Sequence, residues 1–351
     1  MFDTCMSQCP VLLPLLHLTA CAVPDDDAGD LRVPVDQAAP ADAPHWSPGG
    51  GAPRAVPPPE ADLDAVVTRE AQDVVRFVAL GDAGTGASAQ YSVARAIATV
   101  CAQRGCDFAI YLGDNFYDTG VDEVEDWQFE DKFELPYAAL DFPFYPTLGN
   151  HDYGVNGAGY EFWKAPLYVD YSDRSEKWVF PAQFFRVDAG VVELYSLDTN
   201  AMVWGFYEEQ LAWLQERTAR TTATWTIAYG HHPYLSNGPH GNAGSYDGAP
   251  ASPIGNGTYV KQFMDDAVCG TIDLYLCGHD HSRQWLVETC AGTELVVSGA
   301  GAKTTSVDDT NETWFQESSL GFYWVEVSAD RLTGAFYDSA GQIEIERTLT
   351  K

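Results

Sequence analysis

Apolar positions from Val74 onward form short runs that polar and glycine-rich segments separate. Runs of this length predict β-strands, and two longer amphipathic stretches, 88–102 and 207–219, predict helices. Early strands alternate with helices, whereas the last third of the chain is mostly strands. We therefore expect an α/β protein with two sheets packed face to face and helices outside. The predicted strands are 76–80, 107–112, 144–148, 183–187, 191–197, 224–229, 273–277, 294–298, 322–327, 334–337 and 342–347.

The first 73 residues lack this pattern. Residues 1–21 hold a short apolar segment that ends in Leu18-Thr19-Ala20-Cys21. Such a segment is too short to span a bilayer and predicts a secretory leader. Its last four residues look like a bacterial lipoprotein signal, in which Cys21 carries the lipid. Because residues 1–20 contain no Lys or Arg, secretion without lipid and a wrongly assigned start stay open as alternatives. We expect an exported protein, either a cell-surface or periplasmic lipoprotein or a secreted one.

Residues 22–73 hold nine of the 20 prolines, and eleven carboxylates against three arginines. A segment of this composition buries too little to offset its ordering entropy. It predicts a disordered acidic tether between the leader, 1–21, and a catalytic domain, 74–351.

Charge limits the partners of the chain. Its 351 residues carry 51 acidic and 19 basic side chains, which gives a formal net charge of −32. This excludes a nucleic-acid or anionic-membrane binder that works by bulk charge, because both need a basic face. With 46% hydrophobic residues the chain is not disordered throughout. We expect a monomer.

Three of the eight cysteines lie in the leader and five in the domain. In an exported protein the five should pair where they can. Cys101 and Cys106 bracket a predicted helix-to-strand turn, and Cys269 and Cys290 flank the 273–285 region, so we predict these two disulfides. Cys277 lies among apolar neighbours and is predicted to be a buried thiol rather than a metal ligand.

Histidine placement indicates a metal site. Six of the eight histidines lie directly after a predicted strand or in a glycine-rich loop that follows one. Imidazole is the commonest metal ligand in proteins, so this placement predicts bound metal. The six are His151, His231, His232, His240, His279 and His281.

Five strand-end segments place a glycine directly before polar donors, which lets the chain turn sharply off the strand. Asp, Asn, His and Tyr donors suit Fe, Mn or Zn, and the lack of Cys argues against a structural zinc site. The segments are Gly81-Asp82-Ala83-Gly84, Gly113-Asp114-Asn115-Phe116-Tyr117, Gly149-Asn150-His151-Asp152, Gly230-His231-His232-Pro233 and Gly278-His279-Asp280-His281.

In this order the five segments resemble the calcineurin-like metallophosphoesterases, and among them the small, tartrate-resistant type of purple acid phosphatase. The likeness runs from Arg76 to about Leu349 and includes Leu197-Asp198-Thr199 and Ser298-Gly299-Ala300-Gly301. It implies a four-layer α/β/β/α sandwich of two mixed sheets flanked by helices.

The resemblance also implies a dinuclear centre in which Asp114 bridges Fe(III) and a divalent ion (Fe, Zn or Mn). Gly84 stands where the broader superfamily has a histidine ligand, and Tyr117 replaces it; the alternative is that Tyr117 is a buried aromatic. The implied ferric ligands are Asp82, Asp114, Tyr117 and His281. The implied divalent ligands are Asp114, Asn150, His231 and His279.

By the same resemblance, His151 and His240 contact phosphate and protonate the leaving group. Support of its neighbours through Asp152 is the alternative role for His151, while His232 is expected to pack. Asp152 and Asp280 are expected to orient other groups.

The function implied is an acid phosphatase that hydrolyses phosphate monoesters by attack of a metal-bound hydroxide on a phosphoryl group clamped by both ions. Its substrate would be a small phosphate ester or a phosphoprotein. Two alternatives stay open: a phosphodiesterase or nucleotide hydrolase on the same scaffold, and a catalytically idle, metal-bearing surface binding protein.

Overall fold

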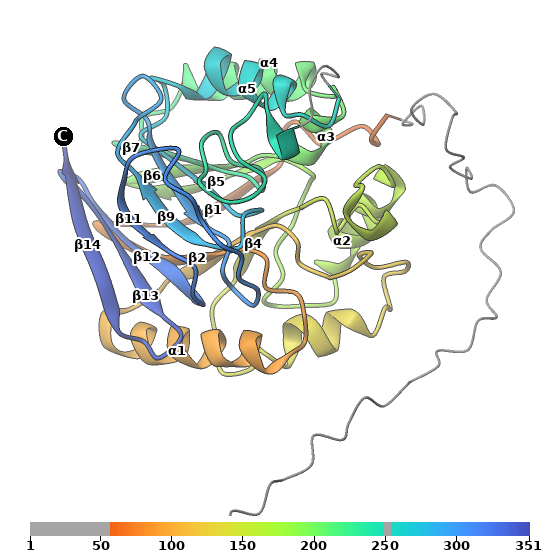
Figure 1. Cartoon of the computed structure of the whole chain (residues 1–351), viewed down its shortest axis with the longest axis horizontal. Helices are drawn as coiled ribbons and strands as arrows, with labels where there is room; N and C mark the ends of the chain where they lie inside the picture. Colours follow the sequence, from red (N-terminus) through yellow and green to blue (C-terminus); the bar gives the residue numbers. More distant parts are fainter. Residues whose placement is uncertain (1–56, 249–253) are drawn as a thin grey trace, which may run out of the picture. The chain divides into compact units, whose positions relative to one another are not determined.

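The computed structural model describes residues 57–248 and 254–351 (Figure 1). The predicted leader, Cys21 and the tether up to residue 56 lie outside the described residues. Within the described part of the chain, no helix is both long enough and apolar enough to cross a membrane.

Two mixed sheets form the centre of the protein. The first has six strands in the order β14 (Ile343–Thr350), β13 (Arg331–Asp338), β12 (Gly321–Ser328), β2 (Val74–Leu80), β3 (Phe108–Leu112) and β4 (Phe144–Thr147). The second has eight strands in the order β1 (Val66–Gln72), β5 (Phe185–Gly190), β6 (Val192–Ser196), β7 (Trp225–Tyr229), β8 (Leu274–Cys277), β10 (Glu294–Ser298), β9 (Arg283–Leu286) and β11 (Thr313–Glu317). In both sheets parallel pairs adjoin antiparallel ones, for example β2–β3 beside β2–β12 and β8–β10 beside β10–β9.

Side-chain alternation in the eight-stranded sheet separates two apolar layers. Leu274 and Leu276 of β8 belong to the core that also contains Val78 and Trp324 of the six-stranded sheet. Tyr275, which lies between them on β8, points to the other face and joins a second apolar cluster. This period of two is what a strand covered on both faces requires.

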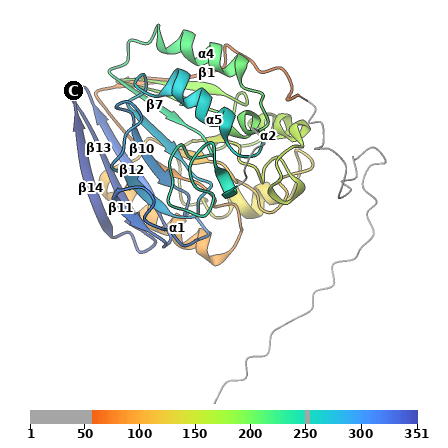
Figure 2. The ribbon, with the colours of Figure 1, turned by 45° about the horizontal axis from the view of Figure 1, so that its top comes forward.

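Helices cover the outer faces of both sheets. In the second apolar cluster Tyr275 packs with Trp213 of α4 (Glu208–Thr218) and Phe263 of α5 (Thr258–Phe263). Two shorter helices are α3 (Thr199–Val203) and α2 (Ala165–Tyr171). Helix α1 (Ser88–Arg104) covers the six-stranded sheet, so that α1 and α4 lie on opposite sides of the two sheets in Figures 1 and 2. The predicted arrangement of two sheets between helices is confirmed.

The predicted tether is wrong over 66–72, because this segment forms strand β1, which pairs in parallel with β5. Its sequence is polar because it is an edge strand with most side chains in solvent. Arg69 ties it to the domain, since its guanidinium donates to Tyr145 Oη at 2.7 Å and to Asp107 O at 3.1 Å.

Strands β9 and β11 were not predicted either. Strand β9 begins with Arg283. A charged residue is typical of exposed loops, but the side chain of Arg283 is fully buried. The guanidinium donates to Ser319 O at 2.9 Å and Tyr337 O at 3.0 Å and pairs with Glu344. These partners are distant in sequence, so a local pattern could not reveal them.

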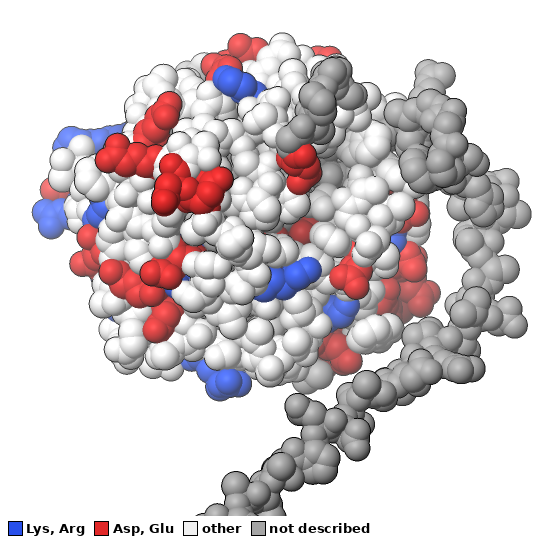
Figure 3. Space-filling model, in the orientation of Figure 1, with Lys and Arg blue, Asp and Glu red and all other residues white. Residues whose placement is uncertain are grey.

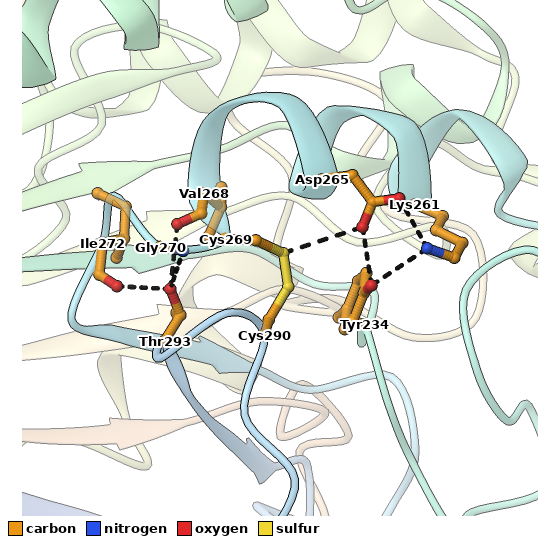
Figure 4. Close-up of a disulfide and its surroundings, with 9 residues drawn as sticks. All are labelled: Tyr234, Lys261, Asp265, Val268, Cys269, Gly270, Ile272, Cys290 and Thr293. Carbon is orange, nitrogen blue, oxygen red and sulfur yellow. Dashed lines mark hydrogen bonds and ion pairs between the residues drawn. A yellow bond between two sulfur atoms is a disulfide. The ribbon is translucent and has the colours of Figure 1, made fainter.

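Both predicted disulfides are present. Cys101–Cys106 joins the last turn of α1 to the segment before β3, with 5.1 Å between the Cα atoms. Cys269–Cys290, with 4.9 Å between the Cα atoms, joins the end of the α5 region to the chain before β10 (Figure 4). Cys277 is the one free cysteine of the described residues and is buried, as predicted.

Trp178 is a large core side chain whose substitution tests the apolar packing behind the ligand loops. It is fully buried, donates from Nε1 to Tyr168 O at 2.9 Å and packs against Phe116 and Phe133. Trp178→Ala should lower the free energy of unfolding by about 3–5 kcal/mol, because it leaves a cavity in the core. The measurement is urea denaturation. The control Trp127→Ala, at a side chain that is 63% exposed, should change it by about 0.5 kcal/mol or less. Equal effects of the two changes would refute the packing role.

Candidate metal centre

The predicted ligands follow parallel strands of both sheets. Asp82 follows β2, Asp114 follows β3 and Asn150 follows β4, all in the six-stranded sheet, while His231 follows β7 and His279 follows β8 in the eight-stranded sheet. Carboxyl ends of parallel strands meet at one edge of a sheet. The two sheets therefore bring these side chains to a common edge.

Backbone conformation at this edge is unusual for residues with a side chain. Asp82, Asp114 and His279 have φ angles of 57°, 52° and 69°, in the left-handed region that non-glycine residues rarely adopt. Such conformations persist only where the surrounding structure fixes them, and they occur often at functional sites.

Two glycines allow the ligand-bearing loops to approach one another, Gly278 between the two sheets and Gly84 within the six-stranded sheet. A Cβ atom on Gly278 would lie 2.5 Å from Asp82 Oδ2. A Cβ atom on Gly84 would lie 1.8 Å from Asn115 O. No side chain fits at position 84 in this backbone, so a ligand at that position has to come from elsewhere.

Tyr117, Asp82 and His281 form the first group of donors. The Tyr117 hydroxyl donates to Asp82 Oδ1 at 3.0 Å and lies 3.1 Å from His281 Nε2. His281 Nε2 and Asp82 Oδ1 are 3.5 Å apart. The structure thus brings the phenol to two of the three other residues with which it was expected to share an ion.

His231 lies at the centre of the second group. Its Nε2 is 2.9 Å from Asn150 Oδ1, 3.1 Å from His279 Nδ1 and 3.4 Å from Asp114 Oδ1. Ligand atoms of Asp82, Asp114 and His231 all lie within 4.8 Å of one another, and all three residues are buried. The two groups of donors are therefore adjacent, with Asp114 next to both.

Lone pairs point at one another in the second group. His231 Nδ1 lies 2.9 Å from Leu112 O, which only accepts, so Nδ1 carries the hydrogen and Nε2 has the lone pair. Asn150 Nδ2 donates to Gly157 O at 2.9 Å, which turns its Oδ1, another acceptor, toward His231. Acceptors this close repel each other unless a cation lies among them. The donor set fits a metal ion.

Burial sets the protonation of these groups. It lowers the pKa of His231 and of His279, so both imidazoles are neutral and able to bind metal. Burial and the neighbouring Asp114 carboxylate raise the pKa of Asp82 well above its usual range. The same two causes raise the pKa of the Tyr117 hydroxyl. A bound cation would reverse both shifts by favouring the anions.

Asp152 and Asp280 hold the ligand loops from behind. Asp152 accepts hydrogen bonds from the backbone N–H groups of Gly149 at 2.8 Å and of Asn115 and Phe116 at 3.1 Å. It thereby joins the loops after β3 and β4. Asp280 Oδ1 accepts from the His240 backbone N–H at 3.0 Å. Both contacts agree with the orienting role expected for the two carboxylates.

The two predicted proton donors lie beside the ligands. His151 Nδ1 is 2.7 Å from Asp118 O, so Nδ1 donates and Nε2 stays available. The His240 ring stacks on His279 with 4.1 Å between centroids, and its Nδ1 is 2.8 Å from Asp247 Oδ1. Asp247 was not predicted, although its place in a glycine-rich loop seven residues after His240 was a possible signal.

A cavity of about 180 Å³ opens beside the second group of donors. His240 and His279 are in its wall, and so is His232, which is buried with its Nδ1 3.0 Å from Thr199 Oγ1. Tyr117 and His281 do not contribute to the wall of this cavity. Its lining residues are Asn150, Gly157, Ala158, Asn200, Val203, Trp204, His232, His240, Tyr246, Asp247, Gly255 and His279.

Comparison with known proteins gives consistent matches. The family model of the calcineurin-like phosphoesterases matches residues 75–283. Tartrate-resistant acid phosphatase type 5 of Homo sapiens is 29% identical and aligns with 78% of this chain and 90% of its own length. Purple acid phosphatase 3 of Arabidopsis thaliana is 29% identical and aligns with 77% of this chain and 76% of its own length.

Among solved structures, the purple acid phosphatase PPD1 from yellow lupin superposes with a TM-score of 0.59 at 18% identity, over 80% of this chain and 54% of that one. The GAP50 anchor of the Plasmodium inner membrane complex superposes with a TM-score of 0.62 at 19% identity, over 80% and 89%. At these identities the likeness shows a common fold, and it confirms the predicted fold class.

Asp152→Asn tests whether the loops depend on this carboxylate. The amide would turn an NH₂ group toward backbone N–H donors, so we expect a loss of about 1–3 kcal/mol in the free energy of unfolding. Metal affinity should fall by about 10- to 100-fold, as for other groups that orient ligands. Denaturation and metal titration measure the two effects. Asp141→Asn, at an exposed position, should leave both unchanged; unchanged metal affinity in Asp152→Asn would contradict the role.

Proposed function

Because the chain belongs to the calcineurin-like phosphoesterase family, we propose that this dinuclear-metal phosphatase is an acid phosphomonoesterase with one Fe(III) and one divalent ion (Fe, Zn or Mn). The observation that carries the proposal is the convergence of possible metal-ligand atoms around His231 Nε2, with Asn150 Oδ1 at 2.9 Å and His279 Nδ1 at 3.1 Å. Names of the relatives, which are acid phosphatases, support the monoester reaction.

Donor chemistry supports a different ion on each side. Tyr117 provides a phenolate, a hard anionic donor that favours Fe(III), together with Asp82 and His281. Asn150 provides a neutral amide oxygen, which suits a divalent ion, together with His231 and His279. Asp114, whose ligand atom lies within 4.8 Å of those of Asp82 and His231, would be shared by the two sites.

When bound, the two ions supply positive charge for the phosphoryl group and lower the pKa of a water that can attack phosphorus. The protein must also deliver a proton to the departing alkoxide. His240 is placed for this task because it lies in the wall of the cavity, which would hold the leaving group. Asp247 accepts from its Nδ1–H, which leaves Nε2 to face the leaving group.

His151 is placed to bind the phosphate group rather than the leaving group. Its backbone N–H donates to Asp114 Oδ1 at 2.9 Å, and its ring lies 4.5 Å from the Tyr117 ring between centroids. With Nδ1–H held by Asp118 O, a protonated Nε2 would donate to a phosphate oxygen. We assign it to phosphate binding.

Export is part of the proposal. Two disulfides, Cys101–Cys106 and Cys269–Cys290, support an oxidising compartment. We propose a leader over 1–21, a tether that ends before β1, and a monomeric catalytic domain that includes β1 in addition to 74–351. The lipid anchor at Cys21 is proposed with the alternative of plain secretion.

The visible spectrum with metal analysis tests the metal assignment. Iron-loaded protein should show a broad tyrosinate-to-Fe(III) band, and Tyr117→Phe should abolish it without unfolding the domain, since the ring is retained. Tyr91→Phe, a tyrosine of α1, is the matched control and should keep the band. Stoichiometric zinc without iron, or a band that survives in Tyr117→Phe, would refute the ferric site.

Substitution of His240 tests the proton donor. In His240→Ala, kcat for an alkyl phosphate should fall about 100-fold or more, because a poor leaving group needs a proton. The fall for p-nitrophenyl phosphate should be much smaller, because its phenolate leaves unaided. Steady-state kinetics on both esters, and on bis(p-nitrophenyl) phosphate to detect diesterase activity, gives the comparison. Equal losses on the two monoesters would rule out the role, and a preference for the diester would favour a phosphodiesterase.

A further inference from the structure

Lys303 lies in a segment that is fastened to the metal-ligand loops on both sides. Two residues before it, the Gly301 backbone N–H donates to Gly81 O at 3.0 Å, next to Asp82. Two residues after it, the Thr305 backbone N–H donates to His281 O at 2.9 Å. The position of Lys303 is therefore set by the same loops that carry the ligands.

The Lys303 side chain reaches the Tyr117 side of the centre. Its Nζ lies 3.8 Å from the centroid of the Tyr117 ring. Neither Lys303 nor Tyr117 contributes to the wall of the 180 Å³ cavity, so this cation and the leaving-group space are on different sides of the donor groups.

Lys303 differs from the other five lysines in its partners. It forms no hydrogen bond or ion pair with any described residue, although it is half-buried. The other lysines all have acceptors. These are Tyr117 O and Gln128 for Lys132, Asp122 for Lys164, Glu134 for Lys177, Asp265 for Lys261 and Asp273 for Lys351.

The ammonium group of Lys303 contacts the face of the Tyr117 ring but no acceptor oxygen of the described residues. Beside a centre that binds two metal cations its charge is unfavourable, because like charges repel. An anion that binds to the centre removes this penalty and supplies the missing acceptor. The chain has 51 acidic side chains, yet the described residues place none of them in an ion pair with this lysine. The Lys303 ammonium group thus lies beside the donor groups, where an anionic substrate has to bind.

We propose that Lys303 is a substrate-binding residue whose ammonium group donates to a phosphate oxygen on the Tyr117 side of the centre. This inference rests on the proposed phosphatase function. A contact with Lys303 would also orient the substrate. The phosphate group would contact Lys303, and the ester oxygen would face His240 and the cavity.

Inorganic phosphate is the probe, titrated calorimetrically into the metal-loaded full chain. Lys303→Met should raise the Kd for phosphate about tenfold, the loss expected for one hydrogen bond to a charged group. KM for p-nitrophenyl phosphate should rise by a similar factor, with a smaller change in kcat. Lys303→Arg should restore most of the affinity. Lys351→Met removes the same charge from the opposite end of β8, where its partner Asp273 lies, and should change nothing.

Three outcomes separate the possibilities. An unchanged phosphate Kd in both Lys303→Met and Lys303→Gln, at wild-type metal content, overturns the inference. A visible band that moves while the phosphate Kd does not also overturns it, since Lys303 would then act on the Tyr117 phenolate alone. If the loaded wild-type protein itself neither binds phosphate nor hydrolyses monoesters, the proposed function fails instead.

Discussion

The crowding of acceptor atoms at the meeting edge of two sheets is the constraint on which the rest of the structure depends. His231 Nε2 has two oxygen acceptors close by, Asn150 Oδ1 at 2.9 Å and Asp114 Oδ1 at 3.4 Å, and His279 Nδ1 lies 3.1 Å away. Without a cation this arrangement is repulsive, and burial increases the penalty. The site exists because the surrounding structure holds the acceptors in place and because metal ions convert the repulsion into attraction.

Much of the fold serves to hold these groups. The loops after β2 and β8 touch at Gly278, where a side chain would collide with Asp82. Asp152 connects the loops after β3 and β4 through three backbone N–H groups. Behind them Phe116 is packed against Trp178. The left-handed backbone at Asp82 and Asp114 is thus supported by hydrogen bonds on one side and by apolar packing on the other.

The central strands and the candidate ligand residues could be predicted from the sequence because apolar runs end at glycines that precede polar donors. This local signal was sufficient for β2, β3 and β8, and the structure brings the donors that follow them together. It failed for β1 and β9, whose polar side chains are satisfied by partners far along the chain, as for Arg283 with Glu344. Lys303 was missed for the same reason, since only the anchoring of its segment to Gly81 and His281 places it near the centre.

Charge distribution explains how so acidic a chain can use an anionic substrate. Acidic and basic side chains are both scattered over the face seen in Figure 3, and the acidic ones are more numerous. Their field is screened beyond about 10 Å at 0.1 M salt, whereas the ions and Lys303 act at contact distance. A small phosphate ester meets mainly this local positive field. A large polyanion has to approach the acidic surface over many ångströms as well, so the net charge of −32 disfavours it more. The net charge therefore bears on how an anion approaches the protein, whereas the chemistry depends on a few groups at the candidate metal centre.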